Sequence, residues 1–318
     1  MELSLPASLS KLTARQRTAL KIGGYVLWGL IFTLVFVAMK FPDNRLRELA
    51  EAEMSVITGK EVKVEKAGLY RLSGLDMTGV DFYSTGGFAQ PLLRLKRQRI
   101  RMSILPALIG RLSAWGITEP EAGGTLELNV RAKSSDASLG LDFRQFQLSG
   151  ARLEPKSPDH PPTEIDATIS GKVSYSVDPG GEVGLADLGS VLAQIYGATA
   201  GIDLTITGVR LANLASETLP LSELRFDTFT IKGDIAEGRL NLSECSGTGP
   251  KGDLSLQGQI SFTDPIRQSG LRLQIRYQPD EETRKTLGPV IGLKLRDDGR
   301  GVYTGYIVGQ FGSPQVHK

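Results

Sequence analysis

The chain has 318 residues with 37 basic and 35 acidic side chains, a formal net charge of +2, two histidines and one cysteine. A length of this order fits about two domains or one large all-β unit with a tail, and a hydrophobic content of 40% excludes a wholly disordered chain. One cysteine excludes a disulfide framework or a cysteine-rich metal cluster, and two histidines leave little imidazole for catalysis or zinc. We therefore predict no cofactor, no metal and no enzymatic activity.

An apolar run predicts a membrane-spanning helix over residues 22–40. Residues 22–39 (IGGYVLWGLIFTLVFVAM) carry no charge, and their helical length of roughly 27 Å is close to the hydrocarbon thickness of a bilayer. A cleavable signal peptide is the alternative, since it also has a basic front and an apolar stretch. The run is longer than a signal peptide needs, and no small-x-small cleavage motif follows it. An uncleaved anchor is therefore the prediction.

Residues 1–21 form a basic leader that predicts the orientation of this anchor. Its basic side chains lie close to the span, and only Glu2 opposes them: Lys11, Arg15, Arg17 and Lys21. Excess basic charge marks the cytoplasmic side, so the residues from 41 onward are expected in the periplasm, with the anchor in the inner membrane of a Gram-negative cell. That remainder is close to neutral, which predicts no binding of nucleic acid.

A juxtamembrane amphipathic helix is expected over residues 41–59. Asp43 and Asn44 after Pro42 are suitable for a helix start, and Gly59 is suitable for its end. Between them, apolar residues recur at helical spacing: Leu46, Leu49, Ala50, Met54 and Ile57. Such a helix either covers the end of a sheet or lies on a membrane surface.

From residue 60 onward, strict alternation of apolar and polar side chains predicts β-strands. The clearest run is 165–177, in which apolar residues and glycine at odd positions alternate with polar residues such as Asp166 and Lys172. Similar runs occur at residues 126–130, 139–143, 202–206, 254–262 and 271–277. The phase slips between Phe143 and Phe146, which indicates a β-bulge. Strands with one polar face belong to an antiparallel sheet, so the predicted fold is mainly β: a long, curved antiparallel meander with few short helices.

A proline-rich segment divides the exported part into two halves. Residues 154–163 contain four prolines and are predicted as a linker between a first half, 60–153, and a second half, 164–318. The pattern does not decide whether the halves are separate domains or one sheet. Two helices are expected in the second half, one over residues 185–196 and a short one over 281–287 that Pro279 and Asp280 open.

Three short motifs have plainer explanations than the chemistry they suggest. Residues 247–252 (GTGPKG) match G-x-G-x-x-G, but Pro250 interrupts the loop and a strand follows, so a hairpin turn is expected instead of a nucleotide site. Cys245 lacks a histidine that would activate it, and a structural thiol is expected. Asp297-Asp298-Gly299 lacks the later ligands of a calcium loop and predicts a plain turn.

The densest basic run lies in a predicted strand at residues 92–102 (LLRLKRQRIRM). Its cations are expected on an outward face: Arg94, Lys96, Arg97, Arg99 and Arg101. Two interpretations remain open. The face is either a contact site for anionic lipid head groups or an acidic partner, or an ordinary solvated strand surface.

The apolar faces of the strands are the other candidate site. If the sheet folds over, these side chains fill a core; if it stays open, they line a trough that can hold acyl chains or a hydrophobic strand of a partner. Alternation alone does not decide between the two. The candidate groove residues are Ile165, Ile169, Val173, Tyr175, Leu254, Leu256, Ile260, Leu271, Leu273 and Ile275.

The layout of the chain resembles two groups of envelope proteins. A short basic leader, one anchor, Phe41-Pro42, an amphipathic helix ending in Thr58-Gly59-Lys60 and a β-meander are similar to the start of AsmA-type envelope proteins. Residues 252–273 (GDLSLQGQISFTDPIRQSGLRL) more closely resemble the type II secretion system protein N (GspN) family, in which a G-x-L-x-L-x-G-x-I … P … S-x-L-x-L stretch closes the periplasmic domain. These motifs consist of glycines, prolines and alternation, and they supply no catalytic residues.

The resemblance implies a bitopic inner-membrane protein with a periplasmic β-domain, an accessory part of the machine that exports folded proteins across the outer membrane. We therefore expect a non-enzymatic component of the type II secretion system whose sheet docks other secretion subunits. The alternative is an AsmA-like protein that binds or transfers lipids and holds acyl chains in the apolar groove. The expected partners are secretion subunits and membrane lipids.

Overall fold

The computed structural model describes residues 43–71, 73–84, 90–103, 111–132, 136–153, 161–177, 198–213, 223–263, 268–310 and 313–318. The basic leader, the predicted span and the helix expected over residues 185–196 lie outside these ranges. Within them, no helix is both long enough and apolar enough to cross a membrane.

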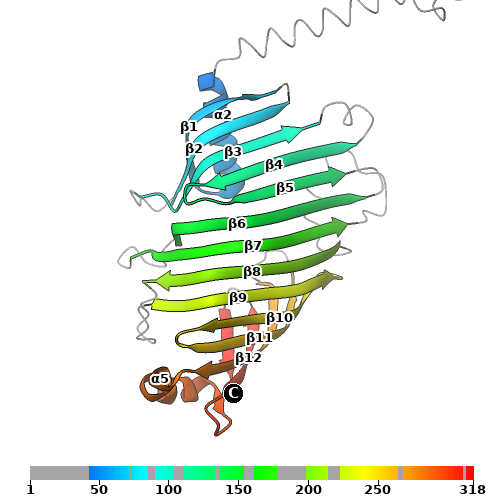
Figure 1. Ribbon diagram of the computed structural model, residues 1–318. Coiled ribbons are helices and arrows are strands. Elements are labelled where there is room, and N and C mark those ends of the chain that lie inside the picture. Colours follow the sequence, from blue (N-terminus) through cyan, green and yellow to red (C-terminus); the bar gives the residue numbers. More distant parts are fainter. Residues whose placement is uncertain are drawn as a thin grey trace, which may run out of the picture.

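One antiparallel sheet of 15 strands makes up most of the described chain (Figure 1). The strands pair in chain order from β1 to β12, and β14 then pairs with β12, β13 and β15. The prediction of a mainly β chain with one long antiparallel sheet and few helices is confirmed. The strands are β1 (Glu61–Tyr70), β2 (Gly74–Tyr83), β3 (Leu93–Met102), β4 (Leu112–Pro120), β5 (Thr125–Ala132), β6 (Ala137–Leu153), β7 (Thr163–Val177), β8 (Ala198–Ala212), β9 (Glu223–Ala236), β10 (Arg239–Gly249), β11 (Gly252–Ser261), β12 (Gly270–Pro279), β13 (Arg296–Asp297), β14 (Tyr303–Gln310) and β15 (Ser313–His317).

The sheet runs without interruption across the proline-rich segment. β6 and β7, on either side of it, pair along their whole length, from Ala137 opposite Val177 to Leu153 opposite Thr163. The segment therefore connects two paired strands, and the strands of residues 60–153 and 164–318 belong to one sheet.

Bulges and glycines keep apolar side chains on one face where the alternation slips. The bulge expected near Phe143 and Phe146 is present, because β6 shifts its register against β7 between these two residues. In β2, Gly79 adopts a φ of 61°, a conformation that glycine reaches at little cost. Met77 and Val80 are three residues apart, yet both are buried on the same side.

The helix α2 (Asp43–Thr58) lies where the sequence predicts a helix, and it packs on the first strands. Leu46 and Ala50 are buried in one cluster with side chains of β1, β2 and β3: Val62, Val64, Ala67, Met77, Val80 and Leu95. Two polar side chains of α2 also accept hydrogen bonds from backbone amides of β1. Ser55 Oγ accepts from Val62 at 3.1 Å, and Glu51 Oε1 accepts from Val64 at 2.8 Å. The helix therefore covers both the face and the edge of β1.

The helix α5 (Glu281–Lys294) is longer than the sequence predicts. It begins at the expected place, since Asp280 caps it and accepts hydrogen bonds from the amides at 282 and 283. It then continues past the predicted end at 287, with Pro289 inside it at an exposed position. Packing explains the continuation: a Cβ at Gly288 would lie 2.9 Å from Tyr303 Oη of β14, so the helix lies close against the sheet.

Two of the short motifs form turns, as predicted. Gly249 pairs with Gly252 at the closed end of the β10–β11 hairpin, so the G-x-G-x-x-G match is part of a hairpin. Asp297 and Asp298 accept hydrogen bonds from the amides of Gly299 and Arg300 at 2.9 and 2.7 Å. Both carboxylates therefore serve the local turn.

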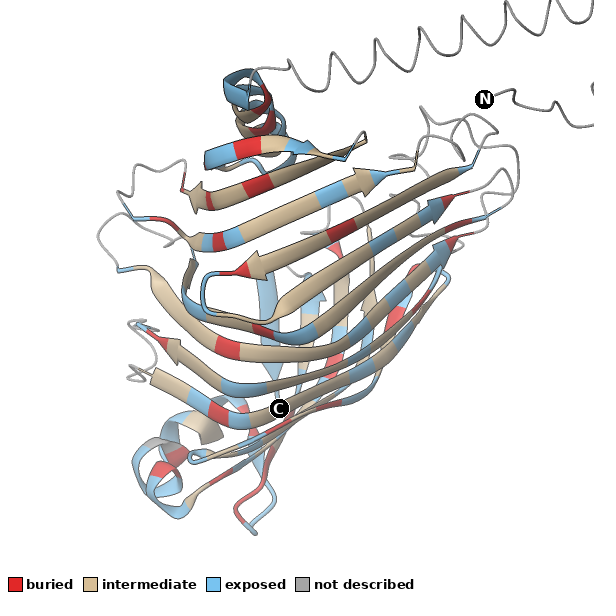
Figure 2. Cartoon of the chain, turned by 45° about the horizontal axis from the view of Figure 1, so that its top comes forward, coloured by how far each residue is buried: buried red, intermediate tan, exposed pale blue. Residues whose placement is uncertain are grey.

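The sheet curls so that its apolar face is concave. In Figure 1, α2 lies behind β1–β3, and the strands after β12 turn to the same rear side. Figure 2 shows the long central strands bending around that side. Because Leu46 and Ala50 of α2 pack on the apolar side chains of β1–β3, the rear, concave side is the apolar one.

Candidate functional site

A single row of apolar residues and glycines crosses thirteen strands of the sheet. Directly opposed residues of antiparallel strands lie on the same face, so the register traces the row from strand to strand. It contains no polar side chain. The row runs Leu69, Leu75, Ile100, Gly116, Leu128, Leu141, Val173, Ile202, Gly233, Leu242, Gly258, Leu273 and Ile307.

A second row lies beside it, two residues away along most of the strands. Tyr175 supplies the one polar atom of its side chains, a phenolic hydroxyl. The row runs Met102, Ala114, Val130, Leu139, Tyr175, Ala200, Ile235, Leu240, Ile260, Leu271 and Gly309. We call the face that carries both rows the apolar face. The ten candidate groove residues from β7, β11 and β12 all lie on it.

The apolar face is covered at its two ends by helices. α2 covers β1–β3, and α5 contacts β12, β13 and β14. Between these ends, side chains such as Leu141, Val173 and Ile202 are half-buried, neither sealed in a core nor fully exposed. In the part of the chain that the structure describes, no other element forms a layer over the central strands. As far as the described residues go, the face is therefore an open trough over most of its length.

The trough is long on the scale of a lipid. Twelve steps between neighbouring strands from β1 to β14, at about 4.8 Å each, give roughly 60 Å along the curved sheet. The longest strand, β6, has 17 residues and so contributes roughly 55 Å of backbone around the curve. A surface of this size can contact whole acyl chains, and its chemistry offers hydrophobic contact with almost no hydrogen-bonding groups.

The convex face carries charges at the positions next to the apolar rows. One row of directly opposed residues consists entirely of ionisable side chains: Glu127, Asp142, Lys172, Asp203, Lys232 and Glu244. Opposite charges lie within ion-pair distance at several points, including Lys232 Nζ and Glu244 Oε2 at 3.0 Å. These pairs offset part of the acidic excess of the row, and the charged side chains keep this face solvated.

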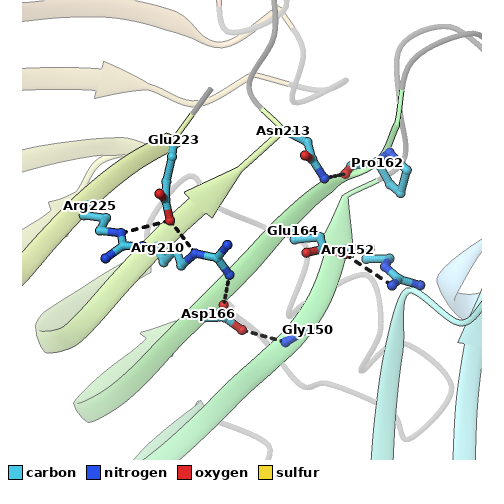
Figure 3. Close-up of polar contacts among 9 residues, drawn as sticks. All are labelled: Gly150, Arg152, Pro162, Glu164, Asp166, Arg210, Asn213, Glu223 and Arg225. Carbon is cyan, nitrogen blue, oxygen red and sulfur yellow. Dashed lines mark hydrogen bonds and ion pairs between the residues drawn. The ribbon is translucent and has the colours of Figure 1, made fainter. Parts of the chain in front are cut away.

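A chain of ion pairs on the same face joins three strands near their ends (Figure 3). Arg210 of β8 lies between Asp166 of β7, with Nη1 and Oδ2 3.0 Å apart, and Glu223 of β9, which also accepts from Arg225 at 2.9 Å. The backbone amide of Gly150 donates to Asp166 at 2.7 Å and is the main cause that lowers the pKa of that carboxyl; Arg210 adds to the effect. These contacts fix neighbouring strands in register.

The five basic residues of β3 share the convex face. Arg97 donates two hydrogen bonds to Asp76, one of 2.8 Å from Nε, and these bonds lower the pKa of Asp76. Arg99 Nε lies 3.5 Å from the same carboxylate, and Arg94 Nε lies 3.9 Å from Asp81. Lys96 is exposed at the bulge that separates these two groups, and Arg101 follows Arg99 on the same face.

A bulge in β3 places these cations together, and the sequence contains a signal for it. The register against β4 shifts between Leu95 and Arg97. Leu95 is buried under α2, whereas Ile100 belongs to the apolar row, so the apolar phase changes from odd to even residues. The odd spacing from Leu95 to Ile100 marks the shift. The pattern at residues 92–102 does not by itself reveal which residues of β1, β4 and β5 lie beside these arginines.

The other candidate reactive groups have structural surroundings. Cys245 is buried, and burial raises the pKa of its thiol, which disfavours the reactive thiolate. Among the described side chains, no group of three or more His, Cys, Asp or Glu residues is placed to hold a metal ion. Burial also raises the pKa of Tyr175 on the apolar face, so its phenol stays neutral at physiological pH.

Comparison of the chain with protein-family models, with curated proteins and with solved structures finds no match. The functional argument therefore depends on the geometry of the sheet and on the chemistry of its two faces.

Proposed function

We propose that the protein is a non-enzymatic envelope protein that holds the acyl chains of lipids against its concave apolar face. The observation that carries the proposal is the unbroken apolar row across thirteen strands, from Leu69 to Ile307, on a face that the described helices cover only at its ends. Monomeric proteins rarely expose an apolar surface of this extent without a ligand or partner. Acyl chains fit it because hydrophobic contact is non-directional and needs no matching hydrogen bonds.

The sequence supports an envelope location for this activity. The uncharged run 22–39 and the basic residues before it are those of an inner-membrane anchor with an exported C-terminal part. The resemblance to AsmA-type proteins favours the same arrangement. A trough of roughly 60 Å attached to one membrane would shield acyl chains from water over much of the distance to a second membrane.

The test is the amount of phospholipid that copurifies with the full-length protein, measured by mass spectrometry. The double variant Ile169→Asp with Val173→Asp places two carboxylates on the apolar face, one on each side of Gly171, at positions where both side chains are half-buried. A carboxylate disfavours contact with hydrocarbon strongly, so bound phospholipid should fall at least about tenfold. The matched control, Thr168→Asp with Lys172→Asp, adds two carboxylates to the convex face of the same strand and should retain its lipid.

Circular dichroism of both variants separates loss of binding from loss of folding. If the Ile169 and Val173 variant unfolds while its control does not, single substitutions at Leu256 or Ile275 on β11 and β12 repeat the test elsewhere in the trough. Wild-type protein that is free of phospholipid after mild purification, or a folded apolar-face variant with an undiminished load, would contradict the proposal.

A second candidate is the role that the type II secretion resemblance predicts, docking of other secretion subunits. The free edge of the sheet at β15 favours it. Hydrogen bonds to α2 satisfy two amides of β1 at the opposite edge. Among the described strands β15 pairs only with β14, and all its residues are exposed. Such an edge can accept a strand from another protein.

A photo-reactive residue at Gln315 of β15 tests this candidate in cells. Cross-links to another secretion subunit are expected from Gln315 but not from Gln257, an exposed residue on β11 inside the sheet. The absence of cross-links from Gln315, together with normal secretion after deletion of the protein, would exclude the docking role.

A further inference from the structure

A group of arginines without acidic partners lies on the convex face of β1–β5. Arg101 of β3 lies opposite Trp115 of β4, and Trp115 lies opposite Asn129 of β5, two residues before Arg131. On the other side of Arg101, Gly74 of β2 is its partner, and Tyr70 of β1 lies opposite Gly74. Arg71 directly follows Tyr70 in the chain. We call Arg71, Arg101 and Arg131, with Tyr70 and Trp115, the arginine patch.

The carboxylates of this region are engaged with other arginines. Asp76 binds Arg97 and Arg99, and Glu127 binds Arg144 at 3.0 Å. Within the described residues, none of the three patch arginines has a carboxylate at ion-pair distance, and Arg101 Nε is buried without a hydrogen-bond partner. Glu119 lies opposite Arg97, four residues along β4 from Trp115, the partner of Arg101. The patch therefore has excess positive charge and unused donors.

Two aromatic rings lie among these guanidinium groups. The guanidinium carbons of Arg71 and Arg99 both lie 5.5 Å from the centre of the Tyr70 ring. Trp115 is half-buried, so part of its indole reaches the surface. Tyrosine and tryptophan beside basic side chains are the residues that proteins place at the interface between membrane and water.

The position of the patch in the chain brings it near the predicted membrane. Only three residues, 40–42, separate the apolar run from the start of α2, and a fully extended connection across them reaches about 14 Å. α2 packs on β1–β3, so these strands are the part of the sheet that the anchor holds closest to the bilayer. An anionic surface is therefore within reach of the part of the sheet that carries unpaired cations.

We propose that the arginine patch binds the anionic phospholipid head groups of the membrane that holds the N-terminal anchor, and so fixes the sheet against that surface. Guanidinium groups suit this ligand because they pair with phosphate through two hydrogen bonds. The inference depends on the proposed membrane anchoring but not on the contents of the trough.

The experiment uses the full chain in lipid nanodiscs and the fluorescence of Trp115. Trp28 is the other tryptophan of the chain, so Trp28→Phe leaves Trp115 as the only indole. A quencher attached to a small fraction of lipid head groups reports contact between the patch and the bilayer. Quenching should be at least about threefold stronger in nanodiscs with phosphatidylglycerol than with phosphatidylcholine alone, and about 0.5 M NaCl should remove the difference by screening.

The triple variant R71Q/R101Q/R131Q should abolish the difference between the two lipids and leaves the Asp76–Arg97 pair intact. The matched control R239Q/R272Q/R276Q removes three exposed arginines of β10 and β12 and should behave as the parent protein. Equal quenching in both lipids, or a difference that survives the triple variant, would overturn the proposal. A change in Trp115 fluorescence on addition of polyglutamate, without quenching by the bilayer, would also overturn the proposal. It would indicate that the patch binds an acidic protein. Phospholipid in the trough is measured separately, so the two proposals fail independently.

Discussion

At the scale of single residues, glycines on the apolar face let neighbouring strands approach closely. Gly171 of β7 has a φ of 127°, and a Cβ there would lie 2.1 Å from the carbonyl oxygen of Asp203 on β8. Phe143 and Leu204 lie directly opposite it on either side. Glycine within a strand often marks a bend or a close approach of backbones, and here it accompanies the curl of the sheet.

Gly171→Ala should therefore destabilise the sheet by about 2 kcal/mol, because it combines backbone strain with a clash against a backbone atom that cannot move aside. Gly140→Ala on β6 is the matched control, since a Cβ there meets no atom within 4 Å. Alanine is better than glycine inside a strand, so this control should melt at the same temperature as wild type or slightly higher. A Gly171→Ala protein that melts at the same temperature as its control would show that the backbones of β7 and β8 do not approach closely at Gly171.

The Asp76–Arg97 pair predicts a dependence of local stability on pH. The hydrogen bond from Arg97 lowers the pKa of Asp76 in the folded protein, so the pair stabilises the fold above the unfolded pKa of about 3.9. The stabilisation is lost as the pH falls through the lower, folded pKa. Because both side chains are partly exposed, at 21% and 35%, about 1 kcal/mol is expected at neutral pH.

Asp76→Asn should accordingly weaken hydrogen-exchange protection in β2 and β3 at pH 7, and the difference from wild type should shrink at pH 3. Asp253→Asn, at an exposed position of β11, is the control and should have no effect at either pH. A constant difference at all pH values would mean that Asn disturbs packing and that the charge contributes nothing.

At the scale of single elements, the sequence predicts a strand correctly wherever apolar and polar residues alternate strictly along it. The pattern at 165–177 predicts β7, and the slip between Phe143 and Phe146 predicts the bulge in β6. The slips at Gly79 and between Leu95 and Arg97 were not predicted, because a glycine or a basic run interrupts the apolar pattern there. The predicted end of α5 at residue 287 was wrong, because helix signals in the local sequence do not include the close approach of Gly288 to Tyr303 of β14.

The helix α2 has one buried side chain that can be tested against an exposed neighbour. Leu46 is 9% exposed within the cluster over β1–β3, whereas Leu49 is 57% exposed. Leu46→Ala should cost about 2–3 kcal/mol of local stability, because it removes buried methyl groups and leaves a cavity. Leu49→Ala should cost under about 0.5 kcal/mol. Equal effects in a urea titration followed by hydrogen exchange would mean that α2 does not seal the sheet.

At the scale of the whole molecule, the register rows explain why the candidate groove could only be partly predicted. Alternation in β7, β11 and β12 identifies apolar residues such as Val173 and Leu273, but it does not say that these two share a row. That follows from five intervening pairings, through Ile202, Gly233, Leu242 and Gly258. The direction of the curl depends on how twist and bulges add up over all strands, which no single strand encodes.

The contacts of the sheet are almost entirely between consecutive strands. Apart from the pairing of β12 with β14, and contacts of β6 with β3 and β4 and of β1 with β3, each of the described strands packs mainly on its neighbours along the chain. Structures of this kind are stabilised by local and nearest-neighbour terms, so a disturbance spreads only a short distance. The sheet should therefore open from its ends in sections and should not unfold in one all-or-none step.

Two truncations at opposite ends of the sheet test this directly by hydrogen exchange. Leu46→Ala lies under the first strands, and Leu273→Ala removes a side chain that is 7% exposed in β12. Each should lower protection by the equivalent of about 2 kcal/mol in its own section, β1–β3 or β11–β14, and leave the other section unchanged. If either truncation lowers protection equally in both sections, the sheet is one cooperative unit. The trough would then need a tightly packed interior that couples its ends, which is incompatible with an open apolar face.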